Sequence, residues 1–557
     1  MSSNVARRLR PCLFHGFQRT QCHRTFSRVP ALYTQDDTKS VTHDYEKRIA
    51  ELEAHRTLSE CYPRLDKSNG RDIVALAKFR RDWAHLQGDE IWEGDVPVTV
   101  AGRVRSIRTA GNKLVFMDID DSTCSIQVLC KYGQLQGEGV DVKQLKDFSK
   151  VARKGDWYTA TGWPHKTSRG ELSVLVTQLP TLLSPSLHQI PETLDDPQTR
   201  ARHRHVDMLV NRESTIPLLV RHHVEKQLND FFHEHDFVKV NTPLLTHGAG
   251  GAVARPFETV ATELEGQQLN LRIAPELWLK RLVVGGLTKV YEIGPAFRNE
   301  GVDATHNPEF SICEFYEAFA TLKDLMQKTE SLLSGMQTKF DELKARTLAG
   351  LPNLDIDLFG PYERLEFLPT LEREIGQSIP DLSAPEAPQQ LTEIFNDKNI
   401  PLPANPTLPR LLDALAAHYL EPLCHAPTFI THHPACLSPL SKHFPCPRTH
   451  QTIAARAELF IKGREYANMY EEENSPFEQR RKFRDQLRYR EVDGEGDGRG
   501  TMDEGFVQVL EWALPPTGGW GCGVDRLVML LSGRDRIAEV LPFGTVRNVV
   551  ALGKGRV

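Results

Sequence analysis

The sequence predicts a multidomain protein in which a small five-stranded β-barrel precedes a large domain of mixed helices and strands. The first observation is a set of five short β-rich runs between residues 98 and 177, separated by Gly, Asp and Ser. The second is the long remainder, residues 206–557, where helical and extended patterns mix without a repeat. The third is the composition of the 557 residues, 40% hydrophobic and 25% charged, which suits a globular chain with two or three cores.

Residues 1–35 have the composition of a mitochondrial transit peptide. They contain six arginines, several Ser and Thr, scattered Leu and Phe, and no Asp or Glu. A secretory signal would need a continuous apolar stretch, which is absent, and a disordered basic tail is the alternative. We therefore expect the protein in the mitochondrial matrix. No run of about eighteen apolar residues occurs in the sequence, so we expect no role in a membrane.

The net charge gives no argument for binding nucleic acid. Removing the six arginines lowers Lys+Arg from 68 to 62 against 74 Asp+Glu, which takes the net charge from -6 to -12. Any contact with RNA must therefore come from a local basic or stacking surface.

Residues 36–90 carry a helical pattern, and residues 91–185 carry the predicted strands. Apolar residues recur at helical steps at Tyr45, Ile49, Leu52, Ile73, Leu76 and Phe79. The five β-rich runs are residues 98–107, 113–119, 124–130, 157–163 and 172–177. Five short strands suit an OB-fold, a barrel that commonly binds oligonucleotides, although a structural β-domain fits the same pattern.

A connector at residues 186–205 leads into the large domain at residues 206–557. This domain contains neither a P-loop nor a GxGxxG signature, so a bound nucleotide would have to be held by side chains. The search for a nucleotide site therefore turns to arginines.

Three segments of the large domain resemble the motifs shared by class II aminoacyl-tRNA synthetases. These are FVKVNTPLL at 237–245, FRNEGVDATHNPEF at 297–310 and GWGCGVDRLVMLL at 519–531. The resemblance implies an α+β catalytic domain on an antiparallel sheet, which uses ATP to form an aminoacyl-adenylate and then charges the 3′ end of tRNA. The first of these motifs, with Pro243, implies a homodimer.

The same resemblance assigns the ATP site. An arginine fork binds phosphate bidentately and neutralises developing charge, so Arg298 and Arg526 are the expected catalytic residues. Phe310 would stack on adenine, with Arg526 against its opposite face. The other residues implied to bind ATP are Glu300, His306, Asn307, Glu465, Gly523 and Asp525. A lone arginine is more often part of a surface ion pair, so the prediction depends on the ordered set.

Four further segments resemble the lysine-specific members of the class: GGAVARPF at 250–257, LRIAPELWLKRLVVGG at 271–286, CEFYEAFA at 313–320 and GREYANMYEEEN at 463–474. The lysine-binding residues that they imply are Gly251, Glu276, Glu314, Tyr316, Asn468, Tyr470 and Glu472. Three carboxylates suit a cationic substrate and would reject aspartate or asparagine.

Glu458 and Glu465 occupy the metal-binding positions of the family. Hard carboxylate oxygens suit Mg²⁺, which would bridge to the phosphates of ATP. The segment CHAPTFITHHPACLSPLSKHFPC at 424–446 raises structural zinc as an alternative, but its spacings fit no common zinc finger.

In the barrel, Arg108, Phe116 and Gln127 fall at the spacing of the lysine family's anticodon-binding residues. Phe116 would stack on a uridine while Gln127 reads a base edge, which makes tRNA(Lys) the expected partner. The alternative places Phe116 in the core of the barrel.

The chain departs from the family at four places. Trp520 and Cys522 replace small aliphatic residues, residues 471–480 replace an Asn-Asp-Pro pattern, residues 493–500 suggest an inserted acidic loop, and residues 345–409 match weakly. Three alternative functions are an aspartyl- or asparaginyl-type synthetase, a lysine ligase that modifies a protein, and a catalytically silent RNA-binding protein. The glutamate pocket disfavours the first and the barrel disfavours the second. The third is disfavoured because the catalytic arginines and the metal-binding glutamates are present.

Overall fold

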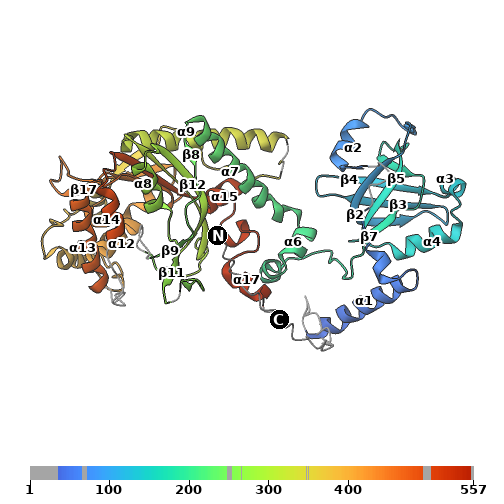
Figure 1. Cartoon of the computed structure of the whole chain (residues 1–557), viewed down its shortest axis with the longest axis horizontal. Coiled ribbons are helices and arrows are strands. Elements are labelled where there is room, and N and C mark those ends of the chain that lie inside the picture. The colour runs from blue at the N-terminus through green and yellow to red at the C-terminus, as the bar shows by residue number, and fades with distance from the viewer. Residues whose placement is uncertain are drawn as a thin grey trace, which may run out of the picture. The chain divides into compact units, whose positions relative to one another are not determined.

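The computed structural model describes residues 35–65, 72–247, 254–264, 266–346, 348, 350–492 and 503–553. The predicted transit peptide up to residue 34, Gly251 and the segment 493–500 lie outside the described residues. The described chain divides into two compact units, one that ends at Gln189 and one that runs from Ile190 to Gly553 (Figure 1).

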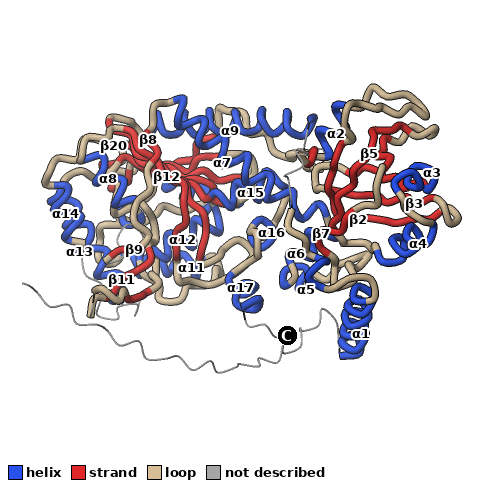
Figure 2. The backbone as a smooth tube through the Cα atoms, turned by 45° about the vertical axis from the view of Figure 1, so that its right-hand side comes forward, coloured by secondary structure: helices blue, strands red, loops and turns tan. Residues whose placement is uncertain are grey.

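The first unit is built on a closed five-stranded barrel, so the predicted OB-fold is confirmed. Its strands are β2 (Val98–Thr109), β3 (Leu114–Asp120), β4 (Ser125–Lys131), β5 (Trp157–Lys166) and β6 (Leu172–Val176). They follow the order β2-β3-β4-β6-β5, and β5 pairs back with β2 to close the barrel (Figure 2). Val115, Met117 and Ile119 are buried inside, and the residues between them face outward, as the period of a strand requires.

Helices precede the barrel, as the pattern predicted, with one exception. The helices are α1 (Gln35–Glu53) and α2 (Leu76–Asp82). The prediction of a helix at Ile73 is wrong, because this residue lies in β1 (Ile73–Val74) and pairs in parallel with Thr99 of β2. Around the barrel lie α3 (Tyr132–Leu135), α4 (Val142–Val151) and β7 (Thr181–Ser184).

The second unit is built on an eight-stranded sheet in the order β14-β15-β18-β19-β20-β13-β12-β8. Its strands are β8 (Val238–Lys239), β12 (Lys289–Phe297), β13 (Glu309–Ala318), β14 (Glu363–Glu366), β15 (Thr428–Thr431), β18 (Arg456–Ile461), β19 (Arg464–Glu471) and β20 (Thr517–Gly523). The pairings are antiparallel except at the two edges, where β8 and β14 run parallel to their neighbours. The predicted antiparallel catalytic sheet is therefore confirmed.

Three helices cover one face of this sheet and form its main core. They are α7 (Ile216–Glu234), α9 (Leu322–Arg346) and α15 (Val524–Ser532), which pack against sheet residues such as Phe315 and Met469 (Figure 1). Trp520 and Cys522, which depart from the family, are buried in this core. The Trp520 ring stacks on Phe315 at 5.2 Å, and its Nε1 donates a hydrogen bond to Oγ1 of Thr329 at 2.9 Å. Since neighbours along a strand point to opposite faces, Gly519, Gly521 and Gly523 lie on the other face of the sheet.

A second core lies partly in the weakly matching region. Its helices are α10 (Phe367–Ile375) and α11 (Ala387–Asp397) of that region, and α12 (Leu408–Tyr419), most of which follows it. Leu371, Leu391 and Leu411 are completely buried there and pack with Ile430 and Phe460 from the β15 and β18 part of the sheet. These helices thus form a layer on one end of the sheet.

This unit also contains further α-helices and strands. They are α5 (Pro197–Arg202), α6 (Arg204–Val210), β9 (Leu245–Thr246), β10 (Glu258–Val260), β11 (Gln268–Leu271), α8 (Glu276–Val284), β16 (His443–Pro445), β17 (Thr452–Ala454), α13 (Pro476–Val492), α14 (Glu504–Leu510), α16 (Ile537–Val540) and α17 (Val546–Gly553). In the part of the chain that the structure describes, no helix is long and apolar enough to cross a membrane.

Candidate active site

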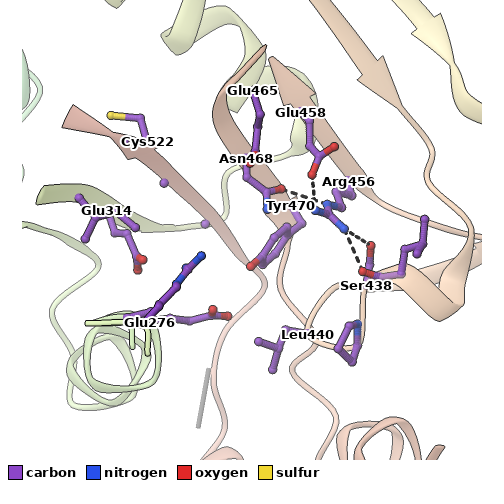
Figure 3. A pocket seen from close by; sticks show the side chains of 18 of the residues that line it. Glu276, Glu314, Ser438, Leu440, Arg456, Glu458, Glu465, Asn468, Tyr470 and Cys522 are labelled. Carbon is purple, nitrogen blue, oxygen red and sulfur yellow. Dashed lines mark hydrogen bonds and ion pairs between the residues drawn. The ribbon is translucent and has the colours of Figure 1, made fainter. Parts of the chain in front are cut away.

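A cavity of about 780 Å³ lies in the second unit and brings most of the predicted site residues together (Figure 3). Its lining includes Glu276, Arg298, Glu300, His306, Asn307, Phe310, Glu314, Tyr316, Glu458, Glu465, Asn468, Tyr470, Gly523, Asp525 and Arg526. Among the described residues predicted for the ATP, lysine and metal sites, Glu472 does not line the cavity, and its side chain is completely buried. A cavity of this size suits a nucleotide with a small second substrate.

The register of the sheet explains how residues far apart in the sequence meet. One row across the paired strands contains Glu314, Gly521, Asn468 and Glu458, and the next contains Tyr316, Gly519, Tyr470 and Arg456. Side chains in such rows share one face, so they converge on the cavity.

Glycine is required in this floor. A Cβ at Gly519 would lie 1.9 Å from Oε1 of Glu472 and 2.6 Å from Cε1 of Tyr316, closer than atoms can approach. Gly519 therefore leaves the space in which the Glu472 carboxylate and the Tyr316 ring lie.

The two predicted catalytic arginines line the cavity from different elements. Arg298 follows β12 directly, and its guanidinium lies 5.1 Å from the ring of Phe310 on the returning strand β13. Arg526, in the first turn of α15, donates from Nη1 to the backbone oxygen of Glu465 at 2.6 Å, and its Nη2 lies 3.0 Å from Nε2 of His306. Both cations thus face a cavity with an aromatic ring, which is an arrangement that can hold a phosphorylated, planar ligand.

Two of the predicted ATP-binding residues also support the structure around them. The buried carboxylate of Asp525 pairs with Arg221 of α7 and accepts a 2.7 Å hydrogen bond from the backbone nitrogen of Ser311. Asn307 donates to the backbone oxygen of Glu309 at 2.6 Å and accepts from the nitrogen of Val546 at 3.0 Å. These bonds fix the β12–β13 hairpin next to the first turn of α15.

Buried carboxylates form the other end of the cavity. Glu276 begins α8 and is 3% exposed, while Glu314 on β13 is 6% exposed and accepts a hydrogen bond from the Tyr316 hydroxyl at 3.2 Å. Burial, reinforced by the nearby charge of Glu276, raises the pKa of Glu314 to about 8. The free site therefore carries a proton on Glu314 at neutral pH, and a bound cation would favour its release.

Glu458 and Glu465 lie side by side on β18 and β19 at the nucleotide end (Figure 3). Although burial opposes it, Arg456 and His433 lower the pKa of Glu458 to about 2, and Nε2 of His433 lies 3.0 Å from its Oε2. Burial and the charge of Glu458 raise the pKa of Glu465. Two like charges that destabilise each other favour a cation between them, so this donor pair fits a divalent metal. No cluster of three or more His, Cys, Asp or Glu side chains that could hold a metal ion occurs among the described residues.

Sequence reasoning missed three residues of the site. Lys280 bonds to Glu276, Arg456 bonds to Asn468 and Glu458, and His433 bonds to Glu458. For two of them the spacing indicates the contact. Lys280 is one helical turn after Glu276, and Arg456 lies two residues before Glu458 on one strand face.

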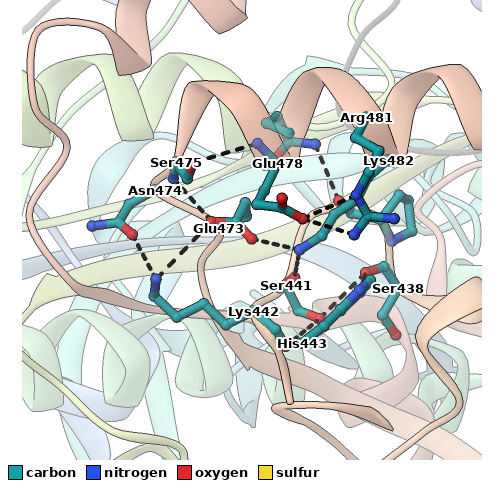
Figure 4. A network of polar contacts seen from close by, with 12 residues as sticks. Ser438, Ser441, Lys442, His443, Glu473, Asn474, Ser475, Glu478, Arg481 and Lys482 are labelled. Carbon is teal, nitrogen blue, oxygen red and sulfur yellow. Dashed lines mark hydrogen bonds and ion pairs between the residues drawn. The ribbon is translucent and has the colours of Figure 1, made fainter. Parts of the chain in front are cut away.

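The unusual residues after Glu472 anchor α13 through a polar network around Glu473 and Lys482 (Figure 4). This helix contributes Phe483 and Leu487 to the lining of the cavity. Lys482 of α13 lies 2.5 Å from Oε2 of Glu473 and donates to the backbone oxygen of Ser441 at 2.7 Å. The departure from the family pattern therefore supports the wall next to the amino-acid end.

The three predicted anticodon-binding residues lie on adjacent strands of the barrel. Phe116 is half-buried between the buried Val115 and Met117, so it faces outward rather than into the core. It pairs in register with Arg108, whose guanidinium lies 6.0 Å from its ring. Gln127 lies on β4 and accepts a hydrogen bond from Ser173 at 3.3 Å. An aromatic face beside a cation and an amide on an OB-fold is suited to an unpaired base.

Comparison with known proteins agrees with these observations. Residues 196–547 match the family described as tRNA synthetases class II (D, K and N), and residues 98–182 match the OB-fold nucleic acid binding domain. The chain is 37% identical over 545 residues to the lysine–tRNA ligase cla4 of Cladosporium cladosporioides, covering 93% of this chain and 87% of that protein. It is 40% identical over 458 residues to the mitochondrial lysine–tRNA ligase of Schizosaccharomyces pombe, covering 82% and 85%. It is also 37% identical over 470 residues to a probable cytoplasmic lysine–tRNA ligase of Encephalitozoon cuniculi, covering 82% and 88%.

Proposed function

The chain belongs to the lysine–tRNA ligases among the class II tRNA synthetases, and on this premise we propose that it charges tRNA(Lys) for translation in mitochondria. The observation that carries the proposed site is that one cavity is lined by two kinds of group. The buried carboxylates Glu276 and Glu314 are one kind, and Arg298, Arg526 and Phe310 are the other. The carboxylates suit a substrate with ammonium groups, and the arginines with the aromatic ring suit a nucleotide.

In the first half-reaction, the carboxylate oxygen of lysine attacks the α-phosphorus of ATP, and the bond to the bridging oxygen of pyrophosphate breaks. Arg298 would contact the α-phosphate and stabilise the charge that develops there, while Arg526 would contact the γ-phosphate. Phe310 would hold adenine by stacking, with His306, Asn307, Glu300, Gly523 and Asp525 around the nucleotide. Glu458 and Glu465 would hold Mg²⁺, which supplies charge neutralisation at the phosphates when bound. The chain itself provides no covalent nucleophile, so its contribution is alignment and electrostatic stabilisation.

Lysine would be held by Glu276, Glu314 and Glu472, with Tyr316, Asn468 and Tyr470 around its side chain and Gly251 nearby. Two ammonium groups on the substrate would each find a carboxylate, which an aspartate or asparagine substrate cannot match. In the second half-reaction, the terminal 3′ hydroxyl of tRNA attacks the lysyl carbonyl and AMP leaves.

We further propose that Arg108, Phe116 and Gln127 bind the anticodon and that the active form is a homodimer. The same proposal divides the chain into a transit segment at 1–35, a helical segment at 36–90, a barrel at 91–185, a linker at 186–205 and a catalytic domain at 206–557. Mitochondrial placement is supported by the arginine-rich, acid-free first 35 residues.

The test uses chain that lacks the first 35 residues, supplied with ATP, magnesium and labelled lysine, and with mitochondrial or cytosolic tRNA in separate reactions. We expect labelled lysyl-tRNA with the mitochondrial pool. In parallel, isolated mitochondria should take up the full chain and protect it from added protease, but should not take up the shortened chain. Charging of the cytosolic pool alone, or equal exclusion of both chains, would overturn the mitochondrial role.

A further inference from the structure

A completely buried lysine of the chain itself is bound to Glu276, a carboxylate that lines the cavity. Lys280 is completely buried on α8, one turn after Glu276. Its Nζ lies 2.6 Å from Oε1 of Glu276 and 2.5 Å from Oε2 of Glu472. The rings of Tyr316 and Phe506 lie 5.8 Å and 5.6 Å from the same nitrogen. The ammonium group is thus enclosed by two carboxylates and two aromatic faces, which are the groups that bind a buried cation most strongly.

Both carboxylates held by this ammonium are residues that the proposed function assigns to substrate lysine. Burial would remove the charge from an isolated lysine, yet Glu276 and Glu472 raise the pKa of Lys280, so it stays charged. Burial raises the pKa of Glu472, and Lys280 is the strongest influence that opposes this rise. Without the ammonium group, Glu276 and Glu472 would be two buried like charges close together, and one of them would take up a proton.

The formal charges of these groups match one kind of substrate. When Glu276, Glu314 and Glu472 are all ionised, as a bound cation favours, they carry three negative charges against the one positive charge of Lys280, which leaves two negative charges to balance the substrate. Lysine brings one ammonium group at its α-carbon and one at the end of its side chain. An amino acid with a neutral side chain would leave one buried carboxylate without a partner.

We propose that Lys280 is a positioning and specificity-determining residue, a fixed internal cation that holds Glu276 and Glu472 in place so that the site takes a diammonium amino acid. This inference rests on the proposed lysine site. Lys280 acts through these two carboxylates and does not touch the reacting atoms.

The test compares Lys280→Met with Lys280→Arg in lysine-dependent exchange of pyrophosphate into ATP, measured from about pH 6.5 to about pH 8.5. Loss of a charged hydrogen-bond partner typically costs 1.5–3 kcal/mol, so Lys280→Met should raise the KM for lysine roughly 10- to 150-fold near pH 7. The KM for ATP should change less than about threefold. In Lys280→Met, Glu276 and Glu472 share one proton, which they lose as pH rises. The ratio of the lysine KM of Lys280→Met to that of the wild type should therefore fall as pH rises. Lys280→Arg keeps the charge, so its ratio should not vary with pH, whatever its size.

A matched control is Arg48→Met in the barrel, which removes another completely buried cation, 2.7 Å from Asp156. It should lower the thermal unfolding temperature and leave the KM for lysine unchanged. If Lys280→Met does not fold, Lys280→Gln replaces it, since glutamine retains a donor for Glu276 without a charge. A ratio that is independent of pH for the uncharged variant would overturn the proposal, as would an equal rise in the KM for ATP. Failure of the wild-type protein to exchange with lysine would instead refute the proposed function.

Discussion

Gly519→Ala should separate lysine binding from ATP binding. The added Cβ would lie 1.9 Å from Oε1 of Glu472, about 1.5 Å inside the 3.4 Å at which ordinary contact begins, and 2.6 Å from Tyr316. Glu472 is completely buried and held by Lys280, so it cannot move away without breaking that ion pair. Overpacking of this kind costs about 1–3 kcal/mol.

If that cost is borne by the lysine site, the KM for lysine should rise roughly 5- to 150-fold. The assay is exchange of pyrophosphate into ATP at varied lysine and at varied ATP, with thermal unfolding measured in parallel. Gly335→Ala on α9 is the control for the substitution itself, because nothing lies within 4 Å of its added Cβ. The control should be at least as stable as the wild type and kinetically the same. An unchanged lysine KM in a folded Gly519→Ala protein would refute the assignment of Glu472 and Tyr316 to the lysine site.

Four further predictions concern Glu314, Arg298 and Phe116. Because burial holds the pKa of Glu314 at about 8, the KM for lysine should fall as pH rises toward 8, where the carboxylate forms and pairs with the cation. A carboxyl group whose pKa is raised in the folded state makes the protein less stable as pH rises above the ordinary pKa near 4.5, because the unfolded chain ionises more readily. Glu314→Gln should therefore have a free energy of unfolding higher than wild type by on the order of 3 kcal/mol near pH 7, measured by chemical denaturation, and should lose lysine activation. Arg298→Ala should lower kcat in pyrophosphate exchange roughly 100- to 1000-fold, and an unchanged kcat would remove it from the α-phosphate. Phe116→Ala should raise the KM for tRNA roughly 5- to 150-fold through lost stacking without altering pyrophosphate exchange, whereas equal charging by both proteins would place the anticodon elsewhere.

The barrel could be predicted from the sequence because each strand has its own local signal. β-rich runs between Gly, Asp and Ser predict all five strands. The helical pattern includes Ile73 because three-residue spacing links it to Leu76 and Phe79. Its actual partner is Thr99, more than twenty residues away, and pairing across that distance leaves no trace in the local pattern.

The site residues could be predicted individually, but their positions relative to one another could not. Motif resemblance named Glu314, Asn468 and Glu458, but only the strand register places them in one row across Gly521. Burial is equally invisible in a linear pattern, so the raised pKa of Glu314 could not be read from it. The spacing of Lys280 indicates its pair with Glu276, but not its burial or its second partner, Glu472. Trp520 departs from the family pattern. Because neighbouring side chains of β20 point to opposite faces of the sheet, its ring lies in the core.

The central claim is that the carboxylate end of this cavity selects lysine for activation by ATP. The most direct measurement is exchange of labelled pyrophosphate into ATP with each of the twenty amino acids in turn, with magnesium present. We expect exchange with lysine and none above background with aspartate, asparagine or uncharged amino acids. Exchange with aspartate or asparagine, or equal exchange with an uncharged amino acid, would contradict it.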